Sequence, residues 1–368
     1  MSTKIVGPLC LALLAISVVP GAAVNAASTG WTADASLSVA VGSLGAAAAP
    51  CFGHLSVQCL YAVGGLTQNA NGVASVTMYN PAKKSWSAVA PLKTGRSEAG
   101  VASGPCPANP SRDCVFAIGG ANASGTYLTS AESFDPKTGK WTDVASLPTP
   151  GAPPTFPGRA QLAATSGPCF GDTTQTCVYA LGGYNPALYT LTSVQEYNPR
   201  TKAWSQAASL ATARARFAVT SAPCAGQGSR TCLYAIGGTG PDGFLSSVEM
   251  YSPAANTWKS VAGLHERESA STLGLQGLGD ATAPCSSAAS KLCVYAYGGL
   301  DQKFAILGAT MEFSPGADRW SFLSATMSTA RDNFASASAE CAGNSERCLY
   351  AIGGAGQTYT PSVEQFAP

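Results

Sequence analysis

Cysteine is the residue of this 368-residue chain whose spacing points most directly to a chemistry. Cys10 lies near the N-terminus, and the other twelve cysteines form six local pairs that each enclose six or seven residues. The pairs are Cys51 with Cys59, Cys106 with Cys114, Cys169 with Cys177, Cys224 with Cys232, Cys285 with Cys293, and Cys341 with Cys348. Regularly spaced pairs are typical of a disulfide framework in an oxidising compartment. Zinc would need closer cysteines or histidine partners. We therefore predict six disulfides and no metal or cofactor.

Each second cysteine immediately precedes a strand-like segment that occurs six times. The copies begin at Leu60, Val115, Val178, Leu233, Val294 and Leu349, at steps of 55, 63, 55, 61 and 55 residues, and each ends in Gly-Gly. Three further short strands surround each copy; in the fourth repeat we expect strands at 217–222, 233–236, 248–251 and around Trp258. A period of this length with four strands per repeat is typical of a propeller blade.

The two ends of the chain complement each other. The last repeat stops at Pro368, before its tryptophan strand, whereas Gly30-Trp31-Thr32 lies one period of 55 residues before Trp86. Pairing these ends would cover two strand edges that would otherwise be exposed. We predict an all-β, six-bladed β-propeller of four-stranded blades, formed by residues 27–368 as one domain and closed by the N-terminal strand, which completes the last blade.

The repeats also share a pair of aromatic residues seven positions apart. The pairs are Tyr79 with Trp86, Phe134 with Trp141, Tyr197 with Trp204, Tyr251 with Trp258, and Phe313 with Trp320, and we interpret them as packing between blades. With the Gly-Gly pairs and the Glu-x-aromatic strands at Glu132, Glu249 and Glu364, the chain from Trp31 to Pro368 resembles the kelch family of β-propellers. Thr77, Gln195 and Met311 replace the glutamate in three repeats, and the paired cysteines are an addition to the usual kelch pattern.

The resemblance implies that the first strand of each blade lines a central channel. Five of these strands are preceded by an arginine, namely Arg96, Arg159, Arg214, Arg267 and Arg331, and the first blade has Val41 there. An arginine repeated in this way is either structural, paired with an acid or a carbonyl of a neighbouring blade, or a ligand-binding group. We favour the structural interpretation, because function tends to break the symmetry of a repeat.

The symmetry breaks two residues further on, where a polar ring is expected at the channel mouth. Its members are Ser43, Glu98, Gln161, Arg216, Ser269 and Asn333. The resemblance places the loops between second and third strands on the same face, with Asn69, Asn122, Tyr184, Asp242, Asp301 and Gln357. These twelve residues are our candidate ligand-binding face. The alternative is a water-filled polar mouth that has no ligand.

Composition and motifs narrow the function. With 21 basic and 20 acidic residues and no basic run, the chain lacks the charge pattern of nucleic-acid binders. A copper oxidase of kelch type would need a histidine cluster, but we expect His54 and His265 on opposite faces. We expect a non-catalytic protein that binds a protein or a glycan through its loop face. The alternative is an extracellular carbohydrate isomerase similar to sialic-acid mutarotases, with Glu98 as acid/base and Arg216 as carboxylate clamp.

Residues 1–26 have the layout of a secretory signal peptide. Lys4 precedes the apolar run Leu9–Val19, and Val24-Asn25-Ala26 resembles a cleavage site. An N-terminal membrane anchor is the alternative interpretation, but the run is short and is followed by Pro20-Gly21. We therefore expect a secreted or periplasmic protein that is a monomer and has no membrane attachment after cleavage.

Overall fold

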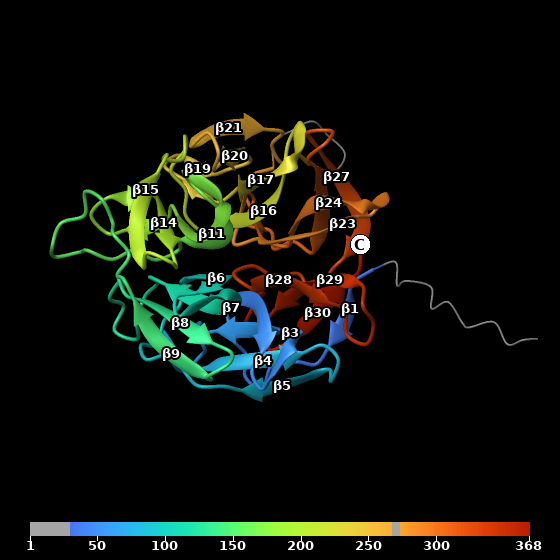
Figure 1. Cartoon of the computed structure of the whole chain (residues 1–368). Coiled ribbons are helices and arrows are strands. Elements are labelled where there is room, and N and C mark those ends of the chain that lie inside the picture. Colours follow the sequence, from blue (N-terminus) through green and yellow to red (C-terminus); the bar gives the residue numbers. More distant parts are fainter. Residues whose placement is uncertain (1–29, 267–272) are drawn as a thin grey trace, which may run out of the picture.

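The computed structural model describes residues 30–266 and 273–368, and every regular element in these ranges is a β-strand. Six antiparallel sheets of four strands are arranged around one axis (Figure 1). The predicted six-bladed β-propeller is thereby confirmed. The described part of the chain contains no helix with the length and apolarity that a membrane crossing requires. The predicted signal peptide lies outside the described residues.

Each blade runs from an inner strand that lines the axis to an outer strand at the rim. The first three blades are β2 (Gly45–Cys51), β3 (His54–Val63), β4 (Val76–Asn80) and β5 (Ser85–Ala88); β6 (Gly100–Cys106), β7 (Asn109–Ile118), β8 (Ala131–Asp135) and β9 (Lys140–Val144); and β10 (Ala163–Cys169), β11 (Asp172–Leu181), β14 (Val194–Asn198) and β15 (Ala203–Ala207).

The last three blades follow the same order. They are β16 (Ala218–Cys224), β17 (Gln227–Ile236), β20 (Val248–Ser252) and β21 (Thr257–Val261); β23 (Gly279–Cys285), β24 (Ala288–Tyr297), β26 (Ala309–Ser314) and β27 (Arg319–Thr326); and β28 (Ala335–Glu340), β29 (Arg347–Ile352), β30 (Val363–Phe366) and β1 (Thr32–Asp34). Short two-stranded sheets lie in the loops: β12 (Tyr184–Asn185) with β13 (Tyr189–Thr190), β18 (Thr239–Gly240) with β19 (Gly243–Phe244), and β22 (Leu275–Gln276) with β25 (Leu300–Asp301).

The ring closes in the sixth blade, where strands from the two ends of the chain pair. β1 lies antiparallel to β30, with Thr32 opposite Gln365 and Asp34 opposite Val363 (Figure 1). The Trp31 ring stacks on Phe366 with the ring centroids 5.7 Å apart. The predicted closure by the N-terminal strand is confirmed, and β30 has a partner on both sides because β29 covers its other edge.

The tryptophans of the outer strands join each blade to the preceding one. The indole N–H of Trp86 donates to the carbonyl of Ala35 at 2.7 Å, and that of Trp141 donates to Ala90 at 2.9 Å. The same bond recurs from Trp204, Trp258 and Trp320, each time to the residue four positions after the preceding tryptophan. Ala35 follows Trp31 by four residues, so the series continues across the closure. The predicted packing of the aromatic pairs is confirmed, with centroids 5.1–5.4 Å apart within each pair.

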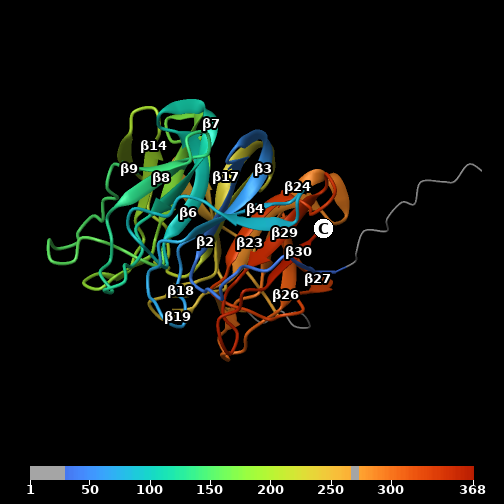
Figure 2. The same ribbon diagram turned by 90° about the horizontal axis from the view of Figure 1, so that it is seen from below.

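Six disulfides connect the first and second strands of the six blades, and all six predicted pairings are confirmed. Their Cα–Cα distances are 4.8–5.0 Å. In blade order, Cys51 is bonded to Cys59, Cys106 to Cys114, Cys169 to Cys177, Cys224 to Cys232, Cys285 to Cys293, and Cys341 to Cys348. The disulfide hairpins lie at one end of the axis, opposite the β18–β19 loop (Figure 2).

The hairpin strands are longer than the sequence pattern indicated. In the fourth blade the second strand begins at Gln227 rather than at the predicted residue 233. The pairing continues through the hairpin, with Ala222 opposite Cys232 and Pro223 opposite Thr231. Each disulfide is therefore enclosed by strand pairing on both sides of the turn rather than placed in an irregular loop.

Replacing Cys224 and Cys232 together by alanine should lower the free energy of unfolding by about 2–3 kcal/mol, since the closed loop restricts the unfolded chain. Urea denaturation of the oxidised protein measures this difference. With reductant present, the wild type should lose more stability than the variant, because it has one more disulfide to lose. Equal midpoints of the two oxidised proteins would show that the disulfide is not a source of stability.

Candidate functional site

Six backbone hydrogen bonds form a closed ring at one end of the central channel. We call the six residues that make it the mouth ring: Ser43, Glu98, Gln161, Arg216, Gly277 and Asn333. The amide of each residue donates to the carbonyl of its counterpart in the preceding blade, over 2.7–3.0 Å, and Ser43 completes the cycle by donating to Asn333. The mouth ring therefore links all six blades through their backbones, whatever side chains they carry.

Every member of the mouth ring has a left-handed backbone, with φ between 48° and 59°. Gly277 adopts this conformation without steric cost, whereas the other five members have a Cβ atom that disfavours it. The cyclic hydrogen bonds fix the conformation in all six blades. Five polar positions that we predicted at the mouth are therefore brought together as expected.

The fifth blade departs from the prediction. Arg267 and Ser269 lie outside the described residues, and Gly277 occupies the mouth-ring position that we assigned to Ser269. Leu275 occupies the position assigned to Arg267: its carbonyl accepts from the amide of Gly238, as the Arg96 carbonyl accepts from Gly65. The inserted residues of this blade thus precede the mouth-ring position rather than follow it, so matching on arginine found the wrong residue.

The four repeated arginines that the structure describes are structural groups. Arg96, Arg159, Arg214 and Arg331 are at most 1% exposed. Arg214 donates to the carbonyls of Gly237 and Ser247 and forms an ion pair with Glu249 over 2.5 Å. All these partners belong to the blade of the arginine itself. The structural interpretation therefore fits, but the predicted partners in a neighbouring blade were wrong.

The arginine and its acid vary together from blade to blade. Arg96–Glu132, Arg214–Glu249 and Arg331–Glu364 form buried ion pairs in the second, fourth and sixth blades. The first blade has Val41 with Thr77, and the fifth has the apolar pair Leu275 and Met311. This pattern is expected because a buried charge is tolerated only with a partner.

The third blade breaks this pattern, since Arg159 faces Gln195 instead of a glutamate. Arg159 is held by the carbonyls of Gly182 and Ala180 and by the Ser193 hydroxyl. Its Nε and the Nε2 of Gln195 are buried without a hydrogen-bond partner. Burial without an acid lowers the pKa of Arg159 to about 9.

The side chains of the mouth ring cross-link above the backbone cycle. The Arg216 guanidinium pairs with the Glu98 carboxylate at 3.2 Å, and the Gln161 amide lies 3.3 Å from both carboxylate oxygens. The Asn333 amide donates to Asp332 at 2.7 Å. The space left between the six residues is only about 110 Å³. The mouth is therefore a polar, partly blocked surface rather than an open passage.

The predicted loop residues have different roles. Oxygen atoms of Asn122 and Asp301 accept amide hydrogen bonds from their own loops, so these two residues hold turns. Asn69, Asp242 and Gln357 are exposed at loop tips. Among the six, Tyr184 lines a concave site next to the mouth ring.

This concave site, which we call the tyrosine groove, lies between the third and fourth blades and measures about 620 Å³. Tyr184 and Tyr189 form one wall, with their rings edge to face and their centroids 6.4 Å apart. Arg216, Gln161 and Gln276 supply polar groups, and Leu188 and Pro241 supply apolar surface. Tyr189 is 68% exposed and has a φ of 60°, so the β12–β13 hairpin presents it to solvent. We did not predict Tyr189 or Gln276; the only available signal was the long step of 63 residues before the fourth repeat.

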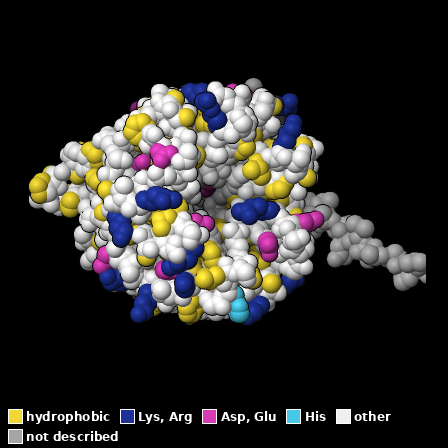
Figure 3. Space-filling view, viewed as in Figure 1, with side chains coloured by type: hydrophobic (Ala, Val, Ile, Leu, Met, Phe, Trp, Pro, Cys, Tyr) yellow, Lys and Arg dark blue, Asp and Glu magenta, His cyan; other side chains and the backbone are white. Residues whose placement is uncertain are grey.

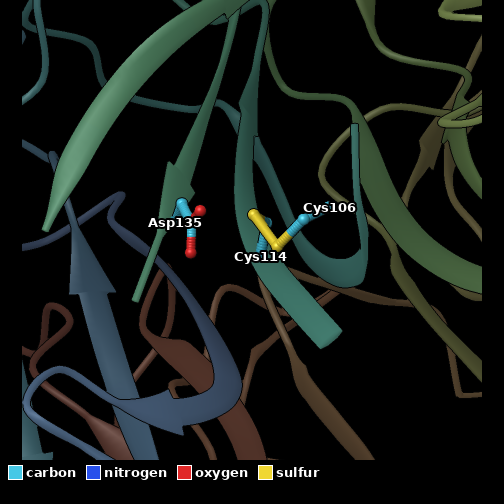
Figure 4. A group of neighbouring side chains, drawn as sticks. All are labelled: Cys106, Cys114 and Asp135. Atoms are coloured by element: carbon cyan, nitrogen blue, oxygen red, sulfur yellow. A yellow bond between two sulfur atoms is a disulfide. The ribbon is translucent and has the colours of Figure 1, made fainter. Parts of the chain in front are cut away.

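Two groups of side chains in the described chain have the proximity of metal ligands, but each contains a disulfide. Cys106, Cys114 and Asp135 form one (Figure 4), and Cys169, Cys177 and Glu196 form the other. In a disulfide neither sulfur is a thiolate, which is the form that binds metals. Hydrogen bonds from Arg112 lower the pKa of Asp135, and Glu196 accepts from the Tyr179 hydroxyl. These carboxylates are therefore engaged in supporting the hairpins.

Comparison with known proteins agrees with the architecture. A family model described as the Kelch motif matches residues 104–148, 172–211 and 222–265, which correspond to the second, third and fourth blades. The chain is a kelch-repeat protein. This confirms the resemblance noted in the sequence and supports a non-catalytic role in protein binding for the propeller.

Several curated proteins are similar to this kelch propeller over part of their length. Kelch-like protein 25 of Xenopus tropicalis is 24% identical over 57% of the chain, and Kelch-like protein 36 of Rattus norvegicus is 29% identical over 58%. Kelch-like protein 23 of Homo sapiens is 23% identical over 71%. The alignments span about a third of the length of these relatives, 32%, 32% and 39% respectively.

Changing Glu249 to Gln should lower the free energy of unfolding by about 3 kcal/mol, because the buried Arg214 would lose its counter-charge. The matched change Gln195→Glu should raise it by about 1–2 kcal/mol, because Arg159 would gain a charge-assisted hydrogen bond. Chemical denaturation of both variants measures the two effects. Two shifts of the same sign would contradict the role assigned to these pairs.

Proposed function

We propose that this kelch propeller is an extracellular binding protein that recognises a protein ligand through its loop face, at the mouth ring and the tyrosine groove. The observation that carries the proposal is the groove itself. It places two tyrosine rings beside Arg216, whose side chain is 36% exposed. Tyrosine and arginine are the side chains that most often dominate binding energy in protein interfaces.

The rest of the loop face supports binding rather than catalysis. Glu98 and Arg216, the pair considered for an isomerase, bond to each other across the mouth. A general acid and a carboxylate clamp would have to contact the substrate separately. Exterior aromatic clusters recur on this face, since Phe244 and Phe304 pack edge to face with centroids 5.7 Å apart, and Phe304 is 75% exposed.

The six disulfides support an extracellular location, since such bonds persist in oxidising compartments. Together with the signal-like residues 1–26, they are the basis for proposing secretion. We further propose that the protein acts as a monomer, as expected from the sequence. A glycan is the second candidate ligand, because Tyr184 and Tyr189 expose aromatic surface next to the amides of Gln161 and Gln276.

The proposal is tested with the oxidised protein immobilised as bait for secreted proteins, with a glycan array as the parallel screen. A ligand of the tyrosine groove should bind the double variant, Tyr184→Ala with Tyr189→Ala, more than about tenfold more weakly, as expected for loss of aromatic anchors. Phe304→Ala is the matched control, because it removes a more exposed ring from the same face.

Three outcomes separate the interpretations. A protein ligand that needs Tyr184 and Tyr189 but not Phe304 supports the proposal, and a glycan with the same dependence supports the second candidate. Ligands that bind all the variants equally would rule out the tyrosine groove. Faster anomer exchange of a sugar that is lost in Glu98→Ala would establish the isomerase instead.

A further inference from the structure

The central channel is lined by two layers of side chains from the inner strands. Alternate residues of a strand face the same side, so each blade contributes one residue to each layer. The layer next to the mouth ring consists of Ala46, Val101, Ala164, Val219, Asp280 and Ser336; the next layer consists of Ala48, Ser103, Ser166, Ser221, Thr282 and Ser338. We call them the first and second layers. The channel measures about 540 Å³.

Asp280 is the residue that breaks the symmetry of this lining. It is the one ionisable side chain among the twelve residues of the two layers, and the equivalent positions hold alanine, valine or serine. Its carboxylate accepts a hydrogen bond from the Val219 amide of the fourth blade. The Ser336 hydroxyl of the sixth blade lies 3.5 Å from Oδ1. Asp280 is thus fixed between two blades at the wall of the channel.

The first layer has two chemically distinct sides. Ala46, Val101, Ala164 and Val219 form an apolar arc around the axis, and Asp280 with Ser336 forms a polar one. The second layer supplies five hydroxyl groups and one methyl group. A ligand suited to this channel therefore has a short apolar chain and a polar end that binds a carboxylate.

The channel is reached from the end where the disulfide hairpins lie. At the other end, the cross-linked side chains of the mouth ring leave little space. Gln58, Asp113, Leu292 and Arg347 line the hairpin end. Viewed along the axis, the molecule is hollowed at its centre and has charged side chains beside the hollow (Figure 3).

The charges around Asp280 favour a cation. Arg347 is a basic group in the lining, and its guanidinium donates to Ser338 and lies next to Glu340. Asp113 is a second acid at the hairpin end. Tyr297, on β24 next to β23, is fully buried and donates its hydroxyl to the Tyr350 carbonyl, so it carries no charge. Among Asp280, Asp113, Glu340 and Arg347, acids outnumber the base by three to one.

We propose that the central channel binds a linear primary amine, with the ammonium group on Asp280 and the alkyl chain against the apolar arc of the first layer. An ammonium group donates three hydrogen bonds, which the carboxylate and the hydroxyls of Ser336 and Thr282 can accept. A divalent metal suits this place less well, because Ca²⁺ takes six to eight oxygen ligands and Asp280 is the single carboxylate of the two layers.

Binding of an amine is coupled to release of a proton. Burial raises the pKa of Asp280 to about 8, although the side chain keeps some contact with solvent in the channel. The free carboxyl group is therefore mostly protonated at about pH 7, and the bound ammonium favours its ionised form. Because the raised pKa favours protonation of the folded state, the stability of the wild type falls as pH rises from about 4 to about 8. Asp280→Asn removes this dependence.

Calorimetric titration near pH 7 with n-butylamine and 1,4-diaminobutane, in phosphate and in HEPES, tests the proposal. The wild type should bind the amines but not n-butanol, and the heats in the two buffers should show up to one proton released per amine. Asp280→Asn should weaken binding more than about tenfold, as expected for loss of one partner of an enclosed charge pair. Asp143→Asn, which neutralises an exposed acid on β9, is the matched control and should bind like the wild type.

Absence of amine binding by the wild type, or equal binding by Asp280→Asn, would overturn the proposal. Binding without proton release would also overturn it, because the carboxyl group would not have ionised. Should Asp280→Asn fail to fold, Ala48→Leu narrows the channel between the hairpin end and Asp280 without changing a charge. Amine binding must then be weakened by Ala48→Leu, and unchanged binding would overturn the proposal.

Discussion

A closed cycle of six backbone hydrogen bonds is the constraint on which the rest of this propeller depends. Each member of the mouth ring bonds to the preceding blade, so no blade can be displaced without breaking two of the bonds. The cycle can close only if the sixth blade is complete, and that blade needs β1 from the other end of the chain. The tryptophan bond from Trp86 to Ala35 connects the same two ends at the rim. Inner and outer circumferences are therefore closed by the same pairing.

The side chains within this frame follow two regimes. Where a residue supports the blade, the repeat is kept or is changed as a unit, as in the substitution of the buried Arg–Glu pair by Leu275 and Met311. Where a residue faces space that the frame leaves open, the blades differ. Arg216 and Tyr189 at the loop face and Asp280 in the channel have no equivalents in the other blades. Both proposals rest on these departures, and they concern opposite ends of the molecule.

The repeat pattern predicted the fold, the disulfides and the closure, because these depend on residues that recur at fixed spacing, such as the paired cysteines and Trp31. It also predicted five of the six mouth-ring residues. It failed in the fifth blade, because Leu275 and Gly277 share backbone positions but not residue types with Arg96 and Glu98. The tyrosine groove depends on the β12–β13 hairpin, and the significance of Asp280 depends on which strand face borders the axis. Neither arrangement has a signal in local sequence.

The closed mouth ring is tested most directly by native-state hydrogen exchange at the six ring amides, followed by NMR. The account predicts that the amides of Ser43, Glu98, Gln161, Arg216, Gly277 and Asn333 all exchange slowly and within a similar range, although they lie in loops, because opening one blade breaks the cycle. Fast exchange at Gly277 or at Ser43, with slow exchange at the others, would contradict the account: it would mean that the fifth blade has a different register or that the ring does not close.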